Sequence, residues 1–238
     1  MILRNAKKTL YLKSLASKEL SFASFLQKII PSMHLSRLPV TFRLLGSGLA
    51  IGMILLFSLP VYAGAPLDGV RTNVNKVLDV LRDPKLKIPS AKEIKKRQLE
   101  NLYGQMFNEV ELARRTLAQH WNDLNGEQRR EFVTLFRQIL EKTYADRIMS
   151  YNNENIAFDG EVMQSDNKAE VQTRIITASK EISFCYRVIK TGSQWKVYDV
   201  VVENVSLVLN YRNQFNEILI KNTPEQLLDI LRKKVKNN

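Results

Sequence analysis

The chain has 238 residues and a formal net charge of +12, with 36 Lys/Arg against 24 Asp/Glu. Residues 1–63 hold eight Lys/Arg and one acid, whereas residues 64–238 hold 28 Lys/Arg and 23 acids. Most of the excess charge therefore belongs to the N-terminal segment, which weakens a nucleic-acid-binding interpretation of the rest. The single cysteine, Cys185, excludes an internal disulfide framework.

Residues 1–63 have the pattern of an export leader. Arg37 and Arg43 precede an apolar run at residues 44–57, and small residues follow up to Ala63. A basic region, an apolar region and a small-residue cleavage site, in this order, are typical of a signal peptide. We therefore expect a leader that is cleaved from an exported, periplasmic domain.

The boundaries of the leader leave alternatives open. The mature chain is expected to begin at Gly64 or Pro66, and the domain covers residues 64–238. Met33 is an alternative start that would give a leader of ordinary length. The uncharged run at residues 44–64 has about the 20 residues that span a bilayer, so a retained anchor is the alternative to cleavage.

Two helices are expected before residue 107. Asp68 is a candidate N-cap for the first, and Ser90 with Glu93 has the spacing of a capping box for the second. From the second helix, Ile94 and Leu102 are expected to face inward. Steps of three and four place these apolar residues on one face of the first helix: Val70, Val74, Val77, Leu78 and Leu81.

A short helix over residues 109–121 is expected to precede a long one that begins after Asn125, its candidate N-cap. The long helix is predicted to carry one continuous apolar stripe. The stripe contains Phe132, Leu135, Phe136, Ile139, Leu140, Tyr144, Ile148 and Tyr151.

The period of the apolar residues then changes to two, which predicts strands near residues 158–163, 171–177 and 182–188. The next segment, SQWKVYDVVVENVSLVLNYRNQF at residues 193–215, is apolar on both strand faces through Val202. A half-buried strand is apolar on one face only, so each face of this strand needs a separate partner.

Helical periodicity returns after residue 210, and Thr223, Pro224 and Gln226 predict the start of a last helix. Helices, then strands, then helices indicate an α+β protein in which helices pack on an antiparallel sheet of about four strands.

Residues with catalytic chemistry are sparse in the exported part. His120 is its only histidine and is expected to be a satisfied surface or cap residue. Asp199 and Glu203 would stand about 13 Å apart on a strand, beyond the ~5–9.5 Å of a glycosidase pair. Cys185, within ISFCYRV, is expected to be an inert buried thiol, and residues 232–236 a solvated tail. We predict no enzyme, no metal site and no cofactor.

Two segments carry a resemblance to a known family. RREFVTLFRQILEKTYADRI at residues 129–148 and WKVYDVVVENVSLVLNYRNQF at residues 195–215 resemble the MlaC-type, toluene-tolerance family of exported lipid-binding proteins. The family often has Gly where this chain has Asn204, and Asn tolerates the positive φ of a turn there. A relative within the family is associated with hopanoid handling, and that branch stays open.

The resemblance implies a periplasmic carrier that binds phospholipid acyl chains in an apolar cavity between the sheet and the N-terminal and C-terminal helices. It implies partners at both membranes: an outer-membrane lipoprotein–porin complex and an inner-membrane ABC transporter with a lipid-binding subunit. Lipid asymmetry of the outer membrane is the implied role. The alternatives are a small-molecule enzyme on a cone-shaped α+β scaffold and a membrane-tethered interaction domain.

With this resemblance, one face of the strand in residues 193–215 is expected to pack on the long helix and the other to line the cavity. Val200 and Val202 would face the cavity and Val201 the other side, with a bulge at Asn204 that exchanges the faces beyond it. The predicted lipid-binding residues are Phe107, Leu112, Leu117, Phe136, Leu140, Tyr144, Val171, Tyr186, Val188, Val200, Val202 and Val205.

Overall fold

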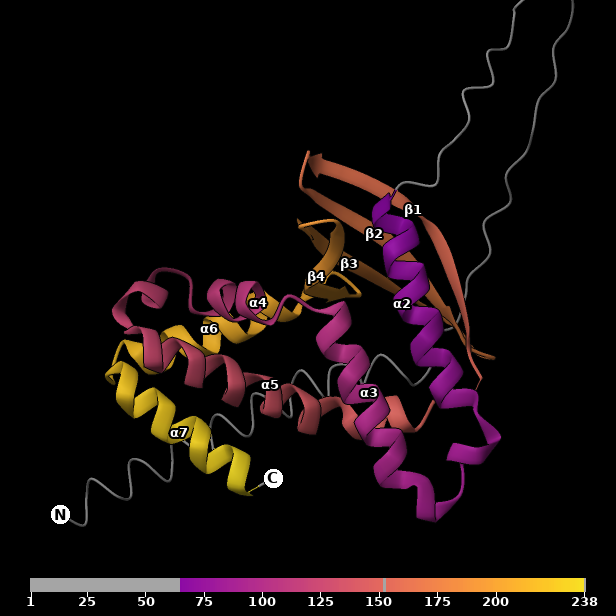
Figure 1. Ribbon diagram of the computed structural model, residues 1–238. Coiled ribbons are helices and arrows are strands. Elements are labelled where there is room, and N and C mark those ends of the chain that lie inside the picture. The colour runs from indigo at the N-terminus through magenta and orange to yellow at the C-terminus, as the bar shows by residue number, and fades with distance from the viewer. Residues whose placement is uncertain (1–64, 152, 238) are drawn as a thin grey trace, which may run out of the picture. The chain divides into compact units, whose positions relative to one another are not determined.

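The computed structural model describes residues 65–151 and 153–237, all of which belong to one compact unit (Figure 1). The predicted leader at residues 1–63, together with Gly64, lies outside the described residues. Helices, then an antiparallel sheet, then two more helices follow one another along the chain. The α+β prediction is therefore confirmed.

The first two helices form an antiparallel hairpin. Helix α2 (Ala65–Arg82) and helix α3 (Lys92–Met106) pack together and are joined by two short 3-10 turns, η1 (Pro84–Leu86) and η2 (Pro89–Ala91). Both turns begin at a proline, whose fixed φ suits the first position of a helical turn.

The predicted helix starts in this hairpin are wrong. Asp68 lies inside the first turn of α2, and Ser90 lies within η2. Helix α3 starts without a side-chain cap, so no capping box forms at Glu93. Ile94 is 48% exposed, against the prediction that it faces inward, while the neighbouring Lys95 is only 7% exposed. The inward side of α3 thus holds the apolar stem of a lysine, with Leu102 half-buried farther along.

A short helix and a long helix follow. Helix α4 (Glu109–Leu117) leads through η3 (Ala118–Asp123) into α5 (Gly126–Met149). The predicted cap of α5 is confirmed, because Asn125 Oδ1 accepts from the Gln128 backbone N–H at 2.9 Å and Gln128 Oε1 accepts from the Asn125 backbone N–H at 3.0 Å.

The strands form one sheet in the order β1-β2-β3-β4-β5, and every neighbouring pair is antiparallel (Figure 1). Four strands are long and the fifth has two residues, so the prediction of about four strands holds. The strands are β1 (Asn155–Ser165), β2 (Lys168–Ile176), β3 (Glu181–Thr191), β4 (Gln194–Val202) and β5 (Val205–Ser206).

A β-bulge in β4 explains why this strand is apolar on both sides in the sequence. Arg187 in β3 pairs with Asp199, but the next residue, Val188, pairs with Val197, so Tyr198 is an extra residue in β4. An extra residue reverses the alternation of side chains. Val197 and Val200 therefore lie on the same face of the sheet although one is odd and the other even.

The bulge is not at Asn204, where we predicted it. Glu203 and Asn204 form a two-residue turn with φ of 47° and 67°, and Val202 pairs directly with Val205 across it. Two successive positive φ values are those of the tight hairpin turns that suit twisted strands. Val205 consequently shares a face with Val202.

Two helices complete the chain: α6 (Leu207–Leu219) and α7 (Pro224–Asn237). Ser206 caps α6 through its hydroxyl, which accepts from the Leu209 backbone N–H at 3.0 Å. The predicted start of α7 is confirmed, since Thr223 and Gln226 bond reciprocally at 3.0 and 3.3 Å.

The described residues hold two apolar cores. One lies between α2, α3 and the sheet. The other lies among α4, α5, α6 and α7, and at its centre aromatic rings of α5 and α6 pack in stacked and edge-on arrangements. Strand β4 packs chiefly on α2, α6 and α4, and α5 packs chiefly on α7 and α4. The prediction that β4 packs on the long helix is therefore wrong. The rings of the second core belong to Phe132, Phe136, Tyr211 and Phe215.

Candidate functional site

The candidate site is the apolar face of the sheet, which is covered by α2. Strands β2, β3 and β4 contribute side chains to this face, and the strand register places them in adjacent rows. Phe184 stands opposite Val202 and Tyr186 opposite Val200. The face also holds one buried polar residue, Thr173, opposite Phe184. Its apolar residues are Ala169, Val171, Phe184, Tyr186, Val188, Val197, Val200 and Val202.

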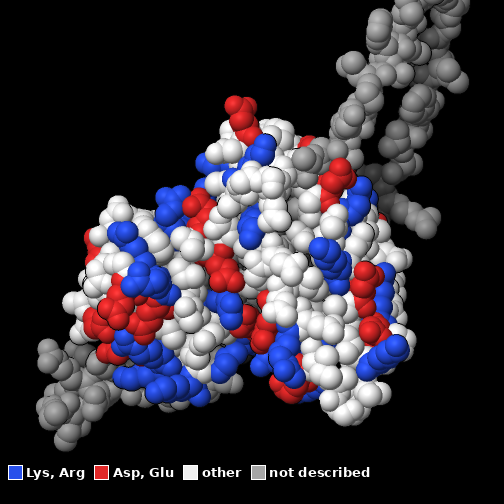
Figure 2. Space-filling view, in the orientation of Figure 1, with Lys and Arg blue, Asp and Glu red and all other residues white. Residues whose placement is uncertain are grey.

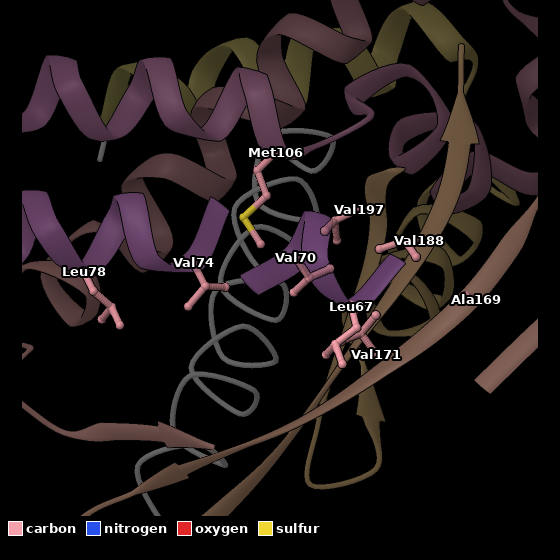
Figure 3. Packing of buried hydrophobic residues seen from close by; sticks show 9 residues of the cluster. All are labelled: Leu67, Val70, Val74, Leu78, Met106, Ala169, Val171, Val188 and Val197. Carbon is pink, nitrogen blue, oxygen red and sulfur yellow. The ribbon is translucent and has the colours of Figure 1, made fainter. Parts of the chain in front are cut away.

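Helices α2 and α3 fill the space over the apolar face. Figure 3 shows Leu67 of α2 beside Val171 of β2, and Val70 of α2 beside Val197 of β4. Met106 of α3 belongs to the same buried cluster. Val171 and Val188 have no exposed surface, and Val70 is 1% exposed. Helix α2 thus packs directly on the sheet, and partly buried side chains such as Tyr186 and Val200 border this contact.

Polar contacts hold both ends of α2 in this position. At its start, the Leu67 backbone N–H donates to Glu161 Oε2 of β1 at 2.6 Å, where a carboxylate also suits the positive end of the helix dipole. At its end, Arg82 donates to the Tyr151 hydroxyl at 2.6 Å and lies over the Tyr151 ring, 5.6 Å from its centre. We call Glu161 and Arg82 the two latches of α2.

Apart from Glu161, the apolar face is electrically neutral. Burial raises the pKa of Tyr186 to about 12, so its hydroxyl keeps its proton at physiological pH.

The opposite face of the sheet is polar and held together by ion pairs. Arg174 lies 2.7 Å from Asp159, and its hydrogen bond holds the pKa of that carboxyl below its usual value. Arg187 reaches Glu170 at 2.8 Å and Asp199 at 3.2 Å. All of these side chains except Asp199 line a hollow of about 300 Å³, to which Phe184 and Val201 also contribute. Its polar, ion-paired lining differs from the apolar cavity that the sequence predicts.

Asp199 ties the polar face to α6. Its side chain is buried and accepts from the Ser206 hydroxyl at 2.6 Å and from the Val208 backbone N–H at 2.9 Å. A carboxylate at the start of a helix is favourable, and here it also anchors β5. Glu203 lies in the turn between the strands rather than on the strand face beside Asp199, so the two acids form no pair.

Cys185 lies on the polar face and is partly buried, not fully buried as predicted. Partial burial, reinforced by nearby Glu170, raises its pKa to about 11. The thiol therefore stays protonated and weakly nucleophilic near neutral pH.

Replacing Cys185 with Ser is expected to leave folding and any bound ligand unchanged, because the side chain touches neither apolar core. In the unaltered chain, alkylation should be slow at neutral pH and accelerate only as the pH rises toward about 11. Native mass spectrometry measures the ligand bound to the Cys185→Ser variant. Mass spectrometry of the unaltered chain after iodoacetamide treatment at each pH measures the extent of alkylation. Rapid alkylation at pH 7 would contradict the assignment.

The twelve predicted lipid-binding residues fall into separate places. Four belong to the helical core: Leu112, Leu117, Phe136 and Leu140. Tyr144 is half-buried on α5. Seven lie on or beside the apolar face of the sheet, which makes them one contiguous surface: Phe107, Val171, Tyr186, Val188, Val200, Val202 and Val205.

Sequence reasoning missed the residues that cover the apolar face. Leu67, Val70, Val74 and Leu78 of α2 all belong to the buried cluster with Val171 and Val188. The sequence placed Val70, Val74 and Leu78 on one face of a helix. Their spacing did not indicate that this face packs on the sheet. Met106, Trp195 and Val197 were also missed.

His120, possible metal ligands and possible membrane-spanning helices complete the description of the described residues. His120 contacts Asp123 at 3.0 Å and Asn216 at 3.1 Å, which confirms it as a satisfied surface residue. Within residues 65–151 and 153–237, no group of three His, Cys, Asp or Glu side chains is placed to hold a metal ion. Over the same ranges, no helix has the length and apolar character needed to cross a bilayer.

An open antiparallel sheet with one apolar face under an N-terminal helix, and one polar face, defines the α+β fold of this chain. The family model described as MlaC protein matches residues 71–233, and the chain belongs to this family. The resemblance noted in the sequence is thereby confirmed.

Two named proteins and one solved structure are similar to the chain. The intermembrane phospholipid transport system binding protein MlaC of Haemophilus influenzae is 28% identical over 99 residues, a match that covers 40% of this chain and only 46% of that protein. Toluene tolerance protein ttg2D of Pseudomonas putida is 22% identical over 175 residues, which cover 71% of this chain and 81% of that protein.

The solved structure is a phospholipid-binding protein from Ralstonia solanacearum in complex with a phospholipid. The TM-score is 0.66 at 21% identity, and the match covers 73% of this chain and 98% of that one. At this identity the likeness establishes the fold.

Proposed function

We propose that this chain is a periplasmic carrier that binds phospholipid acyl chains between α2 and the apolar face of the sheet. The observation that carries the proposal is the asymmetry of the sheet. One face is neutral and apolar from Val171 to Val202, while the other is covered with ion pairs. The names of the similar proteins, which refer to phospholipid binding and transport, support the choice of ligand.

In this proposal the closed arrangement is the empty state. The apolar side chains of α2 take the place of a ligand, and the helix moves away from the sheet when acyl chains enter. The two latches are separate polar contacts on a partly exposed surface, and an average hydrogen bond stabilises by only about 0.5–1.5 kcal/mol. Most of the cost of releasing α2 is the exposure of its buried side chains Leu67, Val70, Val74 and Leu78, at about 1.5–3 kcal/mol each. Acyl chains that take their place on the sheet offset this cost.

The energetics suit a carrier. An acyl chain with about 16 methylenes gains roughly 13 kcal/mol on leaving water, at about 0.8 kcal/mol for each methylene. A bilayer offers nearly the same gain, so the carrier only has to shield the chains during transit. We assign no catalytic step to this protein. The direction of transport then depends on its partners, which we propose to be an outer-membrane lipoprotein–porin complex and an inner-membrane ABC transporter.

Native mass spectrometry of protein purified from cells that produce the full chain tests the ligand. We expect a population heavier than the polypeptide by the mass of a phospholipid, and release of that lipid on denaturation. A hopanoid mass or a small polar ligand would replace the phospholipid assignment. Protein that remains empty after incubation with phospholipid vesicles would overturn the proposal.

A further inference from the structure

The turn between α2 and α3 combines exposed positive charge with exposed apolar side chains. Residues 83–97 carry six Lys/Arg and two acids, a net charge of +4. Residues 64–238 as a whole, with 28 Lys/Arg and 23 acids, have a net charge of +5. We call residues 83–97 the basic tip. The net charge of the basic tip is therefore almost as large as the net charge of the whole domain.

The basic tip also exposes two isoleucines. Ile88 is 54% exposed between the two 3-10 turns, and Ile94 is 48% exposed on the first turns of α3. The cations around them, Lys85, Lys87 and Lys92, are exposed as well. Figure 2 shows that the end of this hairpin is uncharged and that Lys and Arg side chains, with a few acids, flank it on both sides.

The tip is a defined shape rather than a loose loop. Leu86 and Ala91 are buried and anchor it from inside, and Pro84 and Pro89 start its two turns. The Asp83 carboxylate accepts from the Lys85 backbone N–H at 2.8 Å, so this acid serves as a cap. In Figure 1 the tip lies at the free end of the hairpin, away from α4, α6 and α7.

The lysine at the start of α3 destabilises this helix locally. Lys92 is the first residue of α3, and a cation near a helix N-terminus opposes the helix dipole. An exposed isoleucine likewise contributes nothing to the core. These features therefore have no explanation in the folding of the hairpin, whereas basic residues beside exposed apolar ones fit the interface of an anionic bilayer.

We propose that the basic tip docks this protein on the surface of a membrane that contains anionic lipid. Lys85, Lys87 and Lys92 would lie at the level of the lipid phosphates, and Ile88 would enter the headgroup region. Docking there would bring the C-terminal end of α2, where the Arg82 latch lies, next to the bilayer. The inference goes beyond the proposed function and does not depend on it, because membrane binding is measured without lipid transfer.

The test is co-sedimentation with vesicles of phosphatidylcholine, with or without phosphatidylglycerol, using protein from cells that produce the full chain. The tip variant carries Lys85→Gln, Lys87→Gln and Lys92→Gln. The matched control carries Lys190→Gln, Lys233→Gln and Lys236→Gln, three exposed lysines outside the tip. Any N-terminal segment is common to all samples, so differences between them report on the substituted residues.

We expect the unaltered chain to bind the anionic vesicles, and added salt to weaken the binding. Each cation near an anionic surface contributes about fivefold in affinity, so the tip variant should bind on the order of a hundredfold more weakly. Ile88→Ser should weaken binding several-fold at unchanged charge. Circular dichroism should show that all variants keep their helices.

Equal loss of binding in the control would overturn the inference, because it would mean that net charge alone is responsible. Failure of the unaltered chain to bind anionic vesicles would also overturn it. If the tip variant then still lost lipid exchange in cells, the tip would instead contact a protein. Normal vesicle binding together with an empty ligand site would leave the tip inference standing and remove the proposed function.

Discussion

Replacing Val200 with Trp is expected to remove bound phospholipid from a chain that still folds. Val200 lies on the apolar face opposite Tyr186 and packs against the core under α2. An indole ring there occupies volume that acyl chains need once α2 has moved. A free-energy change of 1.4 kcal/mol already alters occupancy about tenfold, and overpacking typically costs about 1–3 kcal/mol. We therefore expect at least a tenfold loss of copurified lipid.

Val201→Trp is the matched control for this experiment, because the adjacent residue carries the same substitution on the opposite face. Val201 is half-exposed beside the polar hollow, so a larger ring there has room in solvent. Lipid content by mass spectrometry and the thermal unfolding midpoint are measured on both variants. Equal lipid loss in both, or retention of lipid in folded Val200→Trp, would show that acyl chains bind elsewhere.

Phe136→Ala is expected to lower the free energy of unfolding by about 3–5 kcal/mol, the usual range for a large aromatic in a core. Phe136 is 1% exposed and contacts the rings of Phe132, Tyr211 and Phe215 at centroid distances of 4.9–5.7 Å. Because this core is separate from the apolar face of the sheet, the fraction that remains folded should still carry lipid.

Ile148→Ala on the same helix provides the control, since Ile148 is 44% exposed and most exposed substitutions change stability by less than about 0.5 kcal/mol. Chemical denaturation gives both values, and mass spectrometry of the folded protein gives lipid content. If Phe136→Ala stayed as stable as the parent but lost its lipid, Phe136 would line the binding site after all. The sequence prediction that grouped it with Val188 would then be right.

The parts of the fold that could be predicted are those fixed by local chemistry. Asn125 and Gln128 form the cap of α5 that their spacing predicts, and Thr223 with Gln226 starts α7 in the same way. These bonds join residues three apart, so the sequence contains both partners. Asn204 likewise adopts the positive φ that its place in the turn suggested.

The parts that could not be predicted depend on distant partners. Ile94 and Lys95 exchange their expected places because the inward side of α3 is set by how it packs on α2. The candidate site was predicted in part for the same reason. Composition indicates which residues are apolar, but only the packing separates Leu112, in the helical core, from Val171, under α2.

Because Tyr198 is an extra residue in β4, the number of residues in this strand decides which side chains face α2. If one residue were lost from or added to this strand between Trp195 and Val200, the end of the strand would rotate by half a turn relative to its start. Asp199 would then face the apolar side of the sheet, and the Val208 backbone N–H in the first turn of α6 would lose the carboxylate that binds it. Evolution can exchange one valine for another in this strand, but small insertions and deletions there should be selected against.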